Sequence, residues 1–153
     1  MRVLLAIDDS ETSEAATQMV IEQARPGKTE VRVLSVVRPP TLLVARGMVG
    51  YDHSLGNTWE METDAAQTLV ENIASQLRAK GVTASSSVEL GDPRAKILEL
   101  AEAWHADLIV VGSDQRTRLA GYLSGGIPEA VARRAFCSVE IVRVPQKETV
   151  EMA

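Results

Sequence analysis

The sequence is poor in aromatic residues, in cysteine, in net positive charge and in long apolar runs. Aromatic side chains make up only 3% of its 153 residues, so a core has to be built from Val, Ile, Leu and Ala. The single cysteine, Cys137, excludes an internal disulfide. No apolar run approaches the ~20 residues that a membrane-spanning helix needs, and Asp8 and Asp9 cut short the apolar start that a secretory signal would continue. We therefore expect a cytoplasmic protein with no membrane partner.

The charge balance and the composition narrow the class of protein further. The net charge is −5, whereas nucleic-acid binders neutralise phosphates with a basic face, so we expect no nucleic-acid partner. Hydrophobic residues at 45% and charged residues at 24% are ordinary for a globular domain. A chain of this length can bury about 70% of its unfolded surface and needs no disulfide or metal to fold. We assign residues 1–145 to one domain and residues 146–153 to a C-terminal tail.

Short apolar segments alternate along the chain with segments of helical periodicity. Continuous apolar runs predict buried strands, and an alternating run near the end predicts an edge or interface strand. The five predicted strands are Val3–Ile7, Val31–Val37, Val82–Leu90, Leu108–Val111 and Val139–Val144. Helices are predicted between them, with start or stop signals at Ser10, Asn57 with Glu60, Gly81, Asp92 with Pro93, and Pro128.

This order of elements predicts an α/β fold. We expect an open, five-stranded, mostly parallel sheet with helices on both faces, in a Rossmann-like three-layer arrangement. One segment departs from the regular alternation, from about Arg38 to Gly56, and it carries Pro39, Pro40 and three glycines. We predict a long loop there, because loops of this length in a compact domain are usually functional or mobile.

The carboxyl ends of parallel strands are where ligands bind in such sheets, at the point where the strand order reverses. Three segments should meet at that edge: residues 7–10, 36–38 and 112–113. The stretch from Gly112 to Gly126 then leads into a helix, and the N–H groups at its start, near Ile127, suit phosphate. Further candidates for anion contact in this stretch are Gly125, Gly126, Arg116 and Arg118.

Each of these residues also has a purely structural interpretation. The glycines can be turn residues, and Asp8 serves equally well as a helix-capping group or a ligand contact. For Asp9 we favour capping, for Ser113 a strand-end hydrogen bond, and for the two arginines solvated loop charges. Neither histidine has partners at ligand spacing, so we expect no metal site. We expect Cys137 to be a small buried residue, and no motif points to catalytic residues.

The segment Ala6–Ser13, AIDDSETS, resembles the opening of universal stress proteins. Val110–Ser113 and Cys137–Arg143 resemble the last two strands of that family, and the resemblance covers about residues 1 to 145. It implies a fold of the adenine nucleotide alpha hydrolase-like type.

ATP-binding members of that family carry a glycine, two residues, a glycine, nine residues, a third glycine and then Ser or Thr. Aligned here, Gly112 and Gly125 match, whereas Gln115 and Gly126 depart from the pattern. Loss of the hydroxyl removes ~1–3 kcal/mol of charge-assisted bonding, which weakens a nucleotide site without abolishing it. The contacts that the resemblance implies are Ala6, Ile7, Asp8, Val36, Gly112, Gln115, Arg116, Gly125, Gly126 and Ile127.

The resemblance implies a stress-response module that binds ATP or another adenine nucleotide without catalysis and forms a homodimer through Val139–Val144. Asp8 would approach the ribose or adenine, and the Val36 backbone would read the adenine edge. An Asp8 charge near a triphosphate would need a cation such as Mg²⁺, held through the phosphates, to offset it. The alternative is a dimeric stress protein whose degenerate site holds no ATP and which acts through protein contacts.

Two other classes have weaker support. A phospho-accepting receiver domain shares the acidic pair Asp8 and Asp9, but Asp52 follows no predicted strand and Lys147 trails behind the last one. Slow ATP hydrolysis would need a base beside the attacking water, and Asp8 is the only candidate. We therefore expect no enzyme activity.

Overall fold

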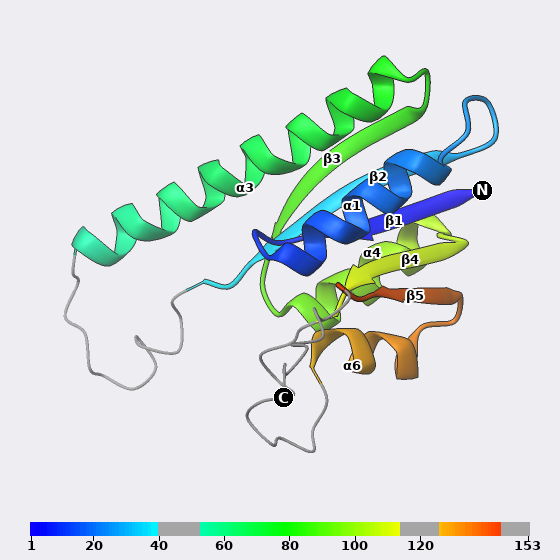
Figure 1. Ribbon diagram of the computed structural model, residues 1–153. Coiled ribbons are helices and arrows are strands. Elements are labelled where there is room, and N and C mark those ends of the chain that lie inside the picture. Colours follow the sequence, from blue (N-terminus) through cyan, green and yellow to red (C-terminus); the bar gives the residue numbers. More distant parts are fainter. Residues whose placement is uncertain (40–52, 114–125, 145–153) are drawn as a thin grey trace, which may run out of the picture.

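The computed structural model describes residues 1–39, 53–113 and 126–144 of the chain (Figure 1). Strands and helices alternate along these ranges, as the sequence predicts. In chain order the elements are β1 (Arg2–Ala6), α1 (Glu11–Gln23), β2 (Glu30–Val37), α3 (His53–Ala79), β3 (Thr83–Leu90), α4 (Pro93–Trp104), β4 (Leu108–Gly112), α6 (Ile127–Arg134) and β5 (Ser138–Val142).

The five strands form one sheet in the order β3-β2-β1-β4-β5, and every neighbouring pair is parallel. The predicted α/β fold is therefore confirmed. The chain runs outward from β1 to β3 on one side and returns through β4 to β5 on the other, so the strand order reverses between β1 and β4. Their carboxyl ends part there, which opens the position where this architecture binds ligands.

Helices cover both faces of the sheet and produce two cores. Figure 1 shows α1 and α3 on one face, with α4 and α6 on the other. Along β1, Val3 and Leu5 belong to the first core, whereas Leu4 and Ala6 belong to the second. This double burial is why β1 is a continuous apolar run. The largest fully buried side chains among the described residues are Leu, Ile and Val, as the low aromatic content predicts.

The helix starts follow local side-chain chemistry. The Ser10 hydroxyl caps α1 by accepting from the Ser13 N–H at 3.2 Å. Asp92 caps α4 by accepting from the Arg94 N–H, and Pro93 occupies the first turn. Both predicted caps are confirmed. The interpretation of Asp9 as the capping group is wrong, because the neighbouring serine holds that position.

Helix α3 begins earlier than the sequence predicts. It starts at His53, so Asn57 and Glu60 lie within the helix and form no capping box at its start. The loop predicted for Arg38–Gly56 is wrong from residue 53 onward, and residues 40–52 lie outside the described ranges. A glycine or asparagine inside a helix costs no more than ~1 kcal/mol, and neighbouring helical turns readily offset that cost. At the other end Gly81, with φ +82°, stops the helix as predicted.

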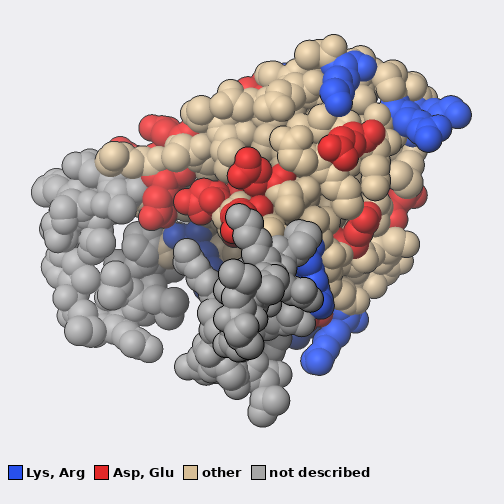
Figure 2. All heavy atoms as spheres, in the orientation of Figure 1, with Lys and Arg blue, Asp and Glu red and all other residues tan. Residues whose placement is uncertain are grey.

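The surface agrees with the acidic composition. Acidic side chains are spread across the face that Figure 2 shows, in keeping with the net charge of −5. No helix within the described ranges is both long and apolar enough to cross a membrane.

At the sheet edge, β5 ends at Val142 rather than at the predicted Val144.

The end of β4 lies very close to the start of α1, and a glycine makes this approach possible. A Cβ atom at Gly112 would stand 2.6 Å from the carbonyl carbon of Thr12 and 2.8 Å from the backbone nitrogen of Ser13. Both are backbone atoms of a helix that is itself packed on the sheet, so they cannot move aside like the end of a flexible side chain. Gly112 therefore has a packing role that turn chemistry alone would not indicate.

We expect Gly112→Ala to lower the free energy of unfolding by about 1–3 kcal/mol through overpacking. Urea unfolding followed by circular dichroism measures the change. Gly27→Asn is the control, because Gly27 (φ +76°) has no atoms within 4 Å of a built Cβ and asparagine tolerates that backbone region. Equal stability of Gly112→Ala and the natural sequence would contradict the packing role.

Candidate functional site

Two sizeable hollows lie at opposite ends of the sheet. The larger, about 530 Å³, lies at the amino ends of the strands and is lined by the segments that enter β1, β2 and β4. The smaller, about 310 Å³, lies at the carboxyl ends, where the strand order reverses. Volume alone favours the first, so the chemistry of each lining has to decide between them.

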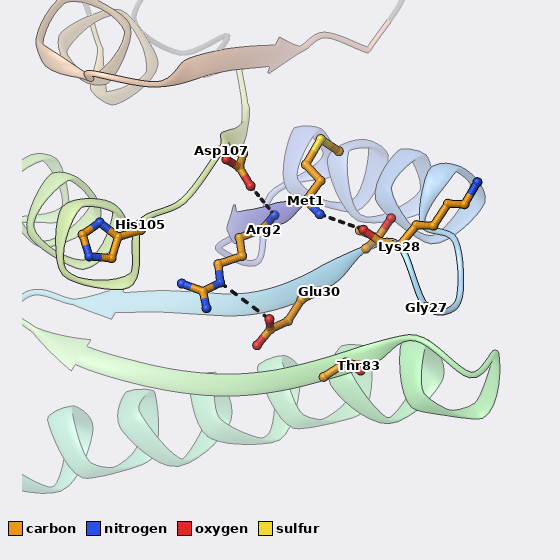
Figure 3. A pocket seen from close by; sticks show the side chains of 9 residues that line it. Met1, Arg2, Gly27, Lys28, Glu30, Thr83, His105 and Asp107 are labelled. Carbon is orange, nitrogen blue, oxygen red and sulfur yellow. Dashed lines mark hydrogen bonds and ion pairs between the residues drawn. The ribbon is translucent and has the colours of Figure 1, made fainter.

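Charged groups in the larger hollow are engaged in holding the fold together. The Arg2 backbone N–H donates to the Asp107 carboxylate at 2.7 Å, and its guanidinium donates to the Trp104 carbonyl at 2.8 Å. Its Nε also lies 3.7 Å from Glu30. Figure 3 shows Asp107 and Glu30 turned toward Arg2. These contacts join the strand starts to the end of α4 and engage Arg2, Glu30 and Asp107 within the fold.

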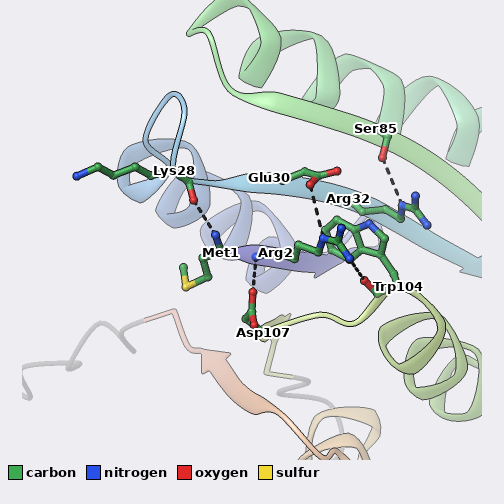
Figure 4. Close-up of polar contacts among 8 residues, drawn as sticks. All are labelled: Met1, Arg2, Lys28, Glu30, Arg32, Ser85, Trp104 and Asp107. Atoms are coloured by element: carbon green, nitrogen blue, oxygen red, sulfur yellow. Dashed lines mark hydrogen bonds and ion pairs between the residues drawn. The ribbon is translucent and has the colours of Figure 1, made fainter.

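The end of α4 strengthens the same junction through its tryptophan. The guanidinium of Arg32 lies 5.0 Å from the centroid of the Trp104 ring, and that of Arg2 lies 5.8 Å away. Both distances are within reach of cation–π attraction. Arg32 also donates to the Ser85 hydroxyl at 3.3 Å, so Trp104 links β1, β2 and β3 (Figure 4). We therefore interpret the larger hollow as a structural junction and not as a ligand site.

The smaller hollow combines an apolar wall with a polar rim. Its apolar wall comes from β1, β2, β4 and the first turns of α4 and α6, and its polar rim comes from the turn after β1 and the start of α1. The apolar members are Ala6, Ile7, Leu34, Val36, Pro93, Ile97, Val111, Ile127 and Pro128. The rim members are Asp8, Asp9, Ser10, Thr12 and Ser13, with Gly112 opposite. A flat, partly apolar group with polar substituents matches such a lining.

A compact hydrogen-bond network holds Asp8 at this rim. The Ser13 hydroxyl donates to Asp8 Oδ1 at 2.8 Å and accepts from the Asp8 backbone N–H at 2.9 Å. The Ser10 N–H donates to the same carboxylate oxygen at 2.8 Å. The Asp8 side chain therefore does two things at once: it fixes the turn between β1 and α1, and it lines the hollow.

The first turn of α6 provides the groups with a partial positive charge. Gly126 is its N-cap and is buried, with an extended backbone and no side chain to cap the helix. The Gly126 carbonyl accepts from the Ala130 N–H at 3.2 Å, whereas the amides of the first turn have no helical partner. Because Ile127 and Pro128 line the hollow, this helix start faces the same space as Asp8.

Most of the sequence-predicted contact residues in the described ranges meet at this hollow. Six of them line it: Ala6, Ile7, Asp8, Val36, Gly112 and Ile127. Gly126 stands beside them as the cap of α6. Gln115, Arg116 and Gly125 lie outside the described residues, as does Arg118. Ser113 instead extends the β4–β5 ladder, since its N–H donates to the Val142 carbonyl at 2.8 Å.

Sequence reasoning missed several lining residues. Thr12 and Ser13 reach the rim because α1 starts directly beside Gly112, a contact between segments far apart in the chain. Leu34 follows from strand alternation, since it shares a sheet face with Val36. The alternation that places Leu34 beside Val36 can be read from the sequence. The contact between the start of α1 and Gly112 cannot.

The lone cysteine lies away from this hollow. Cys137 packs against the second core, and burial raises the pKa of its thiol above the ordinary value. A raised pKa keeps the thiol protonated at neutral pH and makes it a poor nucleophile. Cys137 is therefore partly buried and not fully buried as the sequence predicts, although its contacts are with the core.

Comparison with known proteins gives consistent matches over nearly the whole chain. The model of the Universal stress protein family matches residues 1–143. A universal stress protein of Methanocaldococcus jannaschii is 29% identical over 153 aligned residues, which cover 96% of this chain and 84% of the relative. One from Synechocystis is 24% identical over 149 residues, with 93% and 97% covered.

Solved structures agree with this likeness. That of a second Methanocaldococcus jannaschii stress protein has a TM-score of 0.78 at 25% identity, covering 95% of this chain and 97% of the other. A universal stress protein in complex with cAMP has a TM-score of 0.65 at 22% identity, covering 94% and 96%. A family member from Arabidopsis thaliana with AMP bound has a TM-score of 0.66 at 17% identity, covering 99% and 97%. With the fold, the opening segment and the family model in agreement, this chain belongs to the universal stress protein family.

Proposed function

We propose that this chain is a stress-response module that binds an adenine nucleotide, with ATP as the expected ligand, in the smaller hollow. The observation that carries the proposal is the position of that hollow: it lies where the strand order reverses and is closed by an apolar wall, a polar rim and a helix start. Its volume of about 310 Å³ falls in the range of small-molecule sites. Family members of the same fold with cAMP, dAMP and AMP support the choice of ligand.

The lining suggests which residues would contact each part of such a nucleotide. The base would lie against Ile7, Leu34 and Val36, whose side chains form the apolar wall. The ribose would approach the rim at Asp8, and phosphate would lie at the first turn of α6, beside Ile127. A triphosphate would bring Mg²⁺ with it, because the carboxylate at the rim adds negative charge to the same space.

The hydrogen bonds of Asp8 support binding without catalysis. One carboxylate oxygen accepts from both the Ser10 N–H and the Ser13 hydroxyl, which ties this side chain to the turn. A general base has to lie within hydrogen-bond reach of the proton it takes and be free to accept it. We therefore propose that the nucleotide is a bound signal rather than a substrate.

We also propose that the chain acts as a homodimer through its last strand. The support is that β5 lies at an edge of the sheet and alternates in sequence, because an exposed edge presents unpaired N–H and C=O groups. Its side chains are half-buried in the single chain for all but Ser138. A second copy would cover this edge.

One observation favours a second candidate, a stress protein that holds no ATP and acts through protein contacts alone. Gly126 stands where ATP-binding relatives are expected to offer a hydroxyl, and α6 has no side-chain cap there. Calorimetry separates the two candidates, since the second predicts no heat with any adenine nucleotide at millimolar concentration.

We expect ATP with Mg²⁺, AMP or cAMP to bind the natural chain in isothermal titration calorimetry, and to be recovered unchanged afterwards. Val36→Phe should weaken binding by at least about tenfold, or ~1.4 kcal/mol, by filling the apolar wall. Leu98→Phe is the matched control, because this leucine of α4 packs on the same core but does not line the hollow. Equal losses in the two variants, both folded by circular dichroism, would place the ligand elsewhere.

Gly126→Ser should restore the missing hydroxyl and tighten ATP binding by about tenfold, the value of one charge-assisted hydrogen bond. The backbone there, at φ −71° and ψ −171°, is open to any residue. Gly126→Ala adds the same Cβ without the hydroxyl and should leave affinity unchanged. If the alanine variant gains as much as the serine variant, the hydroxyl is not the cause.

Ser13→Ala should weaken both the turn and the site. We expect it to lower the free energy of unfolding by about 1–3 kcal/mol, because the Asp8 amide loses its acceptor. Hydrogen exchange of that amide should become faster. Thr17→Val is the control, since the Thr17 hydroxyl bonds only to the Ser13 carbonyl inside the helix. Unchanged exchange at Asp8 in Ser13→Ala would show that the hydroxyl does not hold the turn.

A further inference from the structure

The sheet has a second edge, β3, whose backbone could also add a strand from another chain. Strand β3 pairs with β2 over its whole length, from Thr83 to Leu90, so its outer side is long and straight enough to act as a template. Edges of this kind lead to unwanted association unless something blocks them. We therefore expect a feature at the β3 edge that blocks strand addition.

The direction of the β3 backbone groups follows from one hydrogen bond. The Gly91 N–H donates to the Val37 carbonyl of β2 at 3.0 Å, so odd-numbered positions of β3 point inward. Because the direction alternates along a strand, Ala84 and Ser86 present their backbone groups on the open side. The carbonyl of Ala84 accepts there from Arg78 Nε at 2.9 Å.

Three side chains form a connected network along this edge, which we term the edge clasp: Glu71, Arg78 and Ser86. Arg78 Nη1 donates to Glu71 Oε1 at 2.7 Å, and the Ser86 hydroxyl donates to Glu71 Oε2 at 2.6 Å. These two bonds hold the pKa of Glu71 below its ordinary value, so the network is charged at neutral pH. It joins the last turns of α3 to the outer side of β3.

Stability does not explain this network. Both charged side chains are about half exposed, at 52% for Glu71 and 45% for Arg78. Exposed ion pairs of this kind contribute little to the free energy of folding. Their position is the informative feature, because the guanidinium occupies an outward carbonyl and places charge where an added strand would have to lie.

The opposite edge of the sheet, formed by β5, differs from the β3 edge. The Ser113 N–H donates to the Val142 carbonyl, so Val139 and Ile141 present their backbone groups outward. Within residues 1–39, 53–113 and 126–144, no side chain bonds to the backbone of β5. The two edges of one sheet are thus unequal in the described part of the chain.

We propose that the edge clasp closes the β3 edge to strand addition, so that a second copy of this chain can pair only at β5. A sheet with two open edges would form endless chains of molecules, whereas one with a single open edge stops at a pair. The inference concerns β3 and stands whether or not the smaller hollow binds a nucleotide.

The test removes the clasp and measures association. Glu71→Ala combined with Arg78→Ala leaves the net charge unchanged and opens the Ala84 carbonyl. In sedimentation velocity over a concentration series, we expect the weight-average mass to rise at least twofold above that of the natural chain, whatever the natural state is. Lys96→Ala combined with Glu99→Ala is the control, because it also removes one ion pair but leaves the bond from Arg78 to the Ala84 carbonyl in place. That control should sediment like the natural chain.

A proline locates the association at β3. Ser86→Pro, added to the double variant, removes an outward N–H without breaking a bond to β2 and should return the mass to that of the natural chain. Arg78→Ala alone gives the same comparison should the double variant lose its circular dichroism spectrum. A mass equal to that of the natural chain, or a mass increase that the proline does not reverse, overturns the proposal.

Discussion

The closeness of β4 to the start of α1 is the constraint on which the site depends. Gly112 lets the two backbones meet at a distance that no Cβ would allow, and this contact brings Thr12 and Ser13 to the carboxyl edge of the sheet. Ser13 then holds Asp8 through two hydrogen bonds, which fixes this exposed residue at the rim of the hollow. The absence of a side chain at Gly112, at the end of β4, therefore helps to position Asp8, which follows β1.

The two ends of the sheet have separate roles because their polar groups are used differently. At the amino end, the Arg2 backbone N–H donates to Asp107 and its guanidinium donates to the Trp104 carbonyl. These two bonds fix β1 to the end of α4. At the carboxyl end, the amides at the start of α6 have no such partners in the helix. The larger hollow is thus the more charged of the two, yet the smaller one is better suited to an anion. The two edges of the sheet differ in the same way, because a side chain bonds to an outward backbone group at β3 and not at β5 in the described residues.

Much of the fold could be predicted because its signals are local. Double burial marks β1 and β4 as continuous apolar runs, and Ser10 and Asp92 cap helices through their own side chains. The start of α3 could not be predicted, since Asn57 offers a local start signal that a longer helix overrides. In the site, the residues that follow strand ends were predictable from sheet geometry, whereas Ser13 depends on a contact with a glycine about a hundred positions away.

The cap of α6 departs from the family pattern but is compatible with the proposed nucleotide site. Gly126 lacks the hydroxyl, but it keeps the extended backbone that begins the helix, and the first-turn residues Ile127 and Pro128 line the hollow. In the proposed site, the partial positive charge that would attract a phosphate belongs to the whole helix end and not to one side chain. A hydroxyl adds a single hydrogen bond to that field. We therefore propose that its loss weakens the nucleotide site without abolishing it.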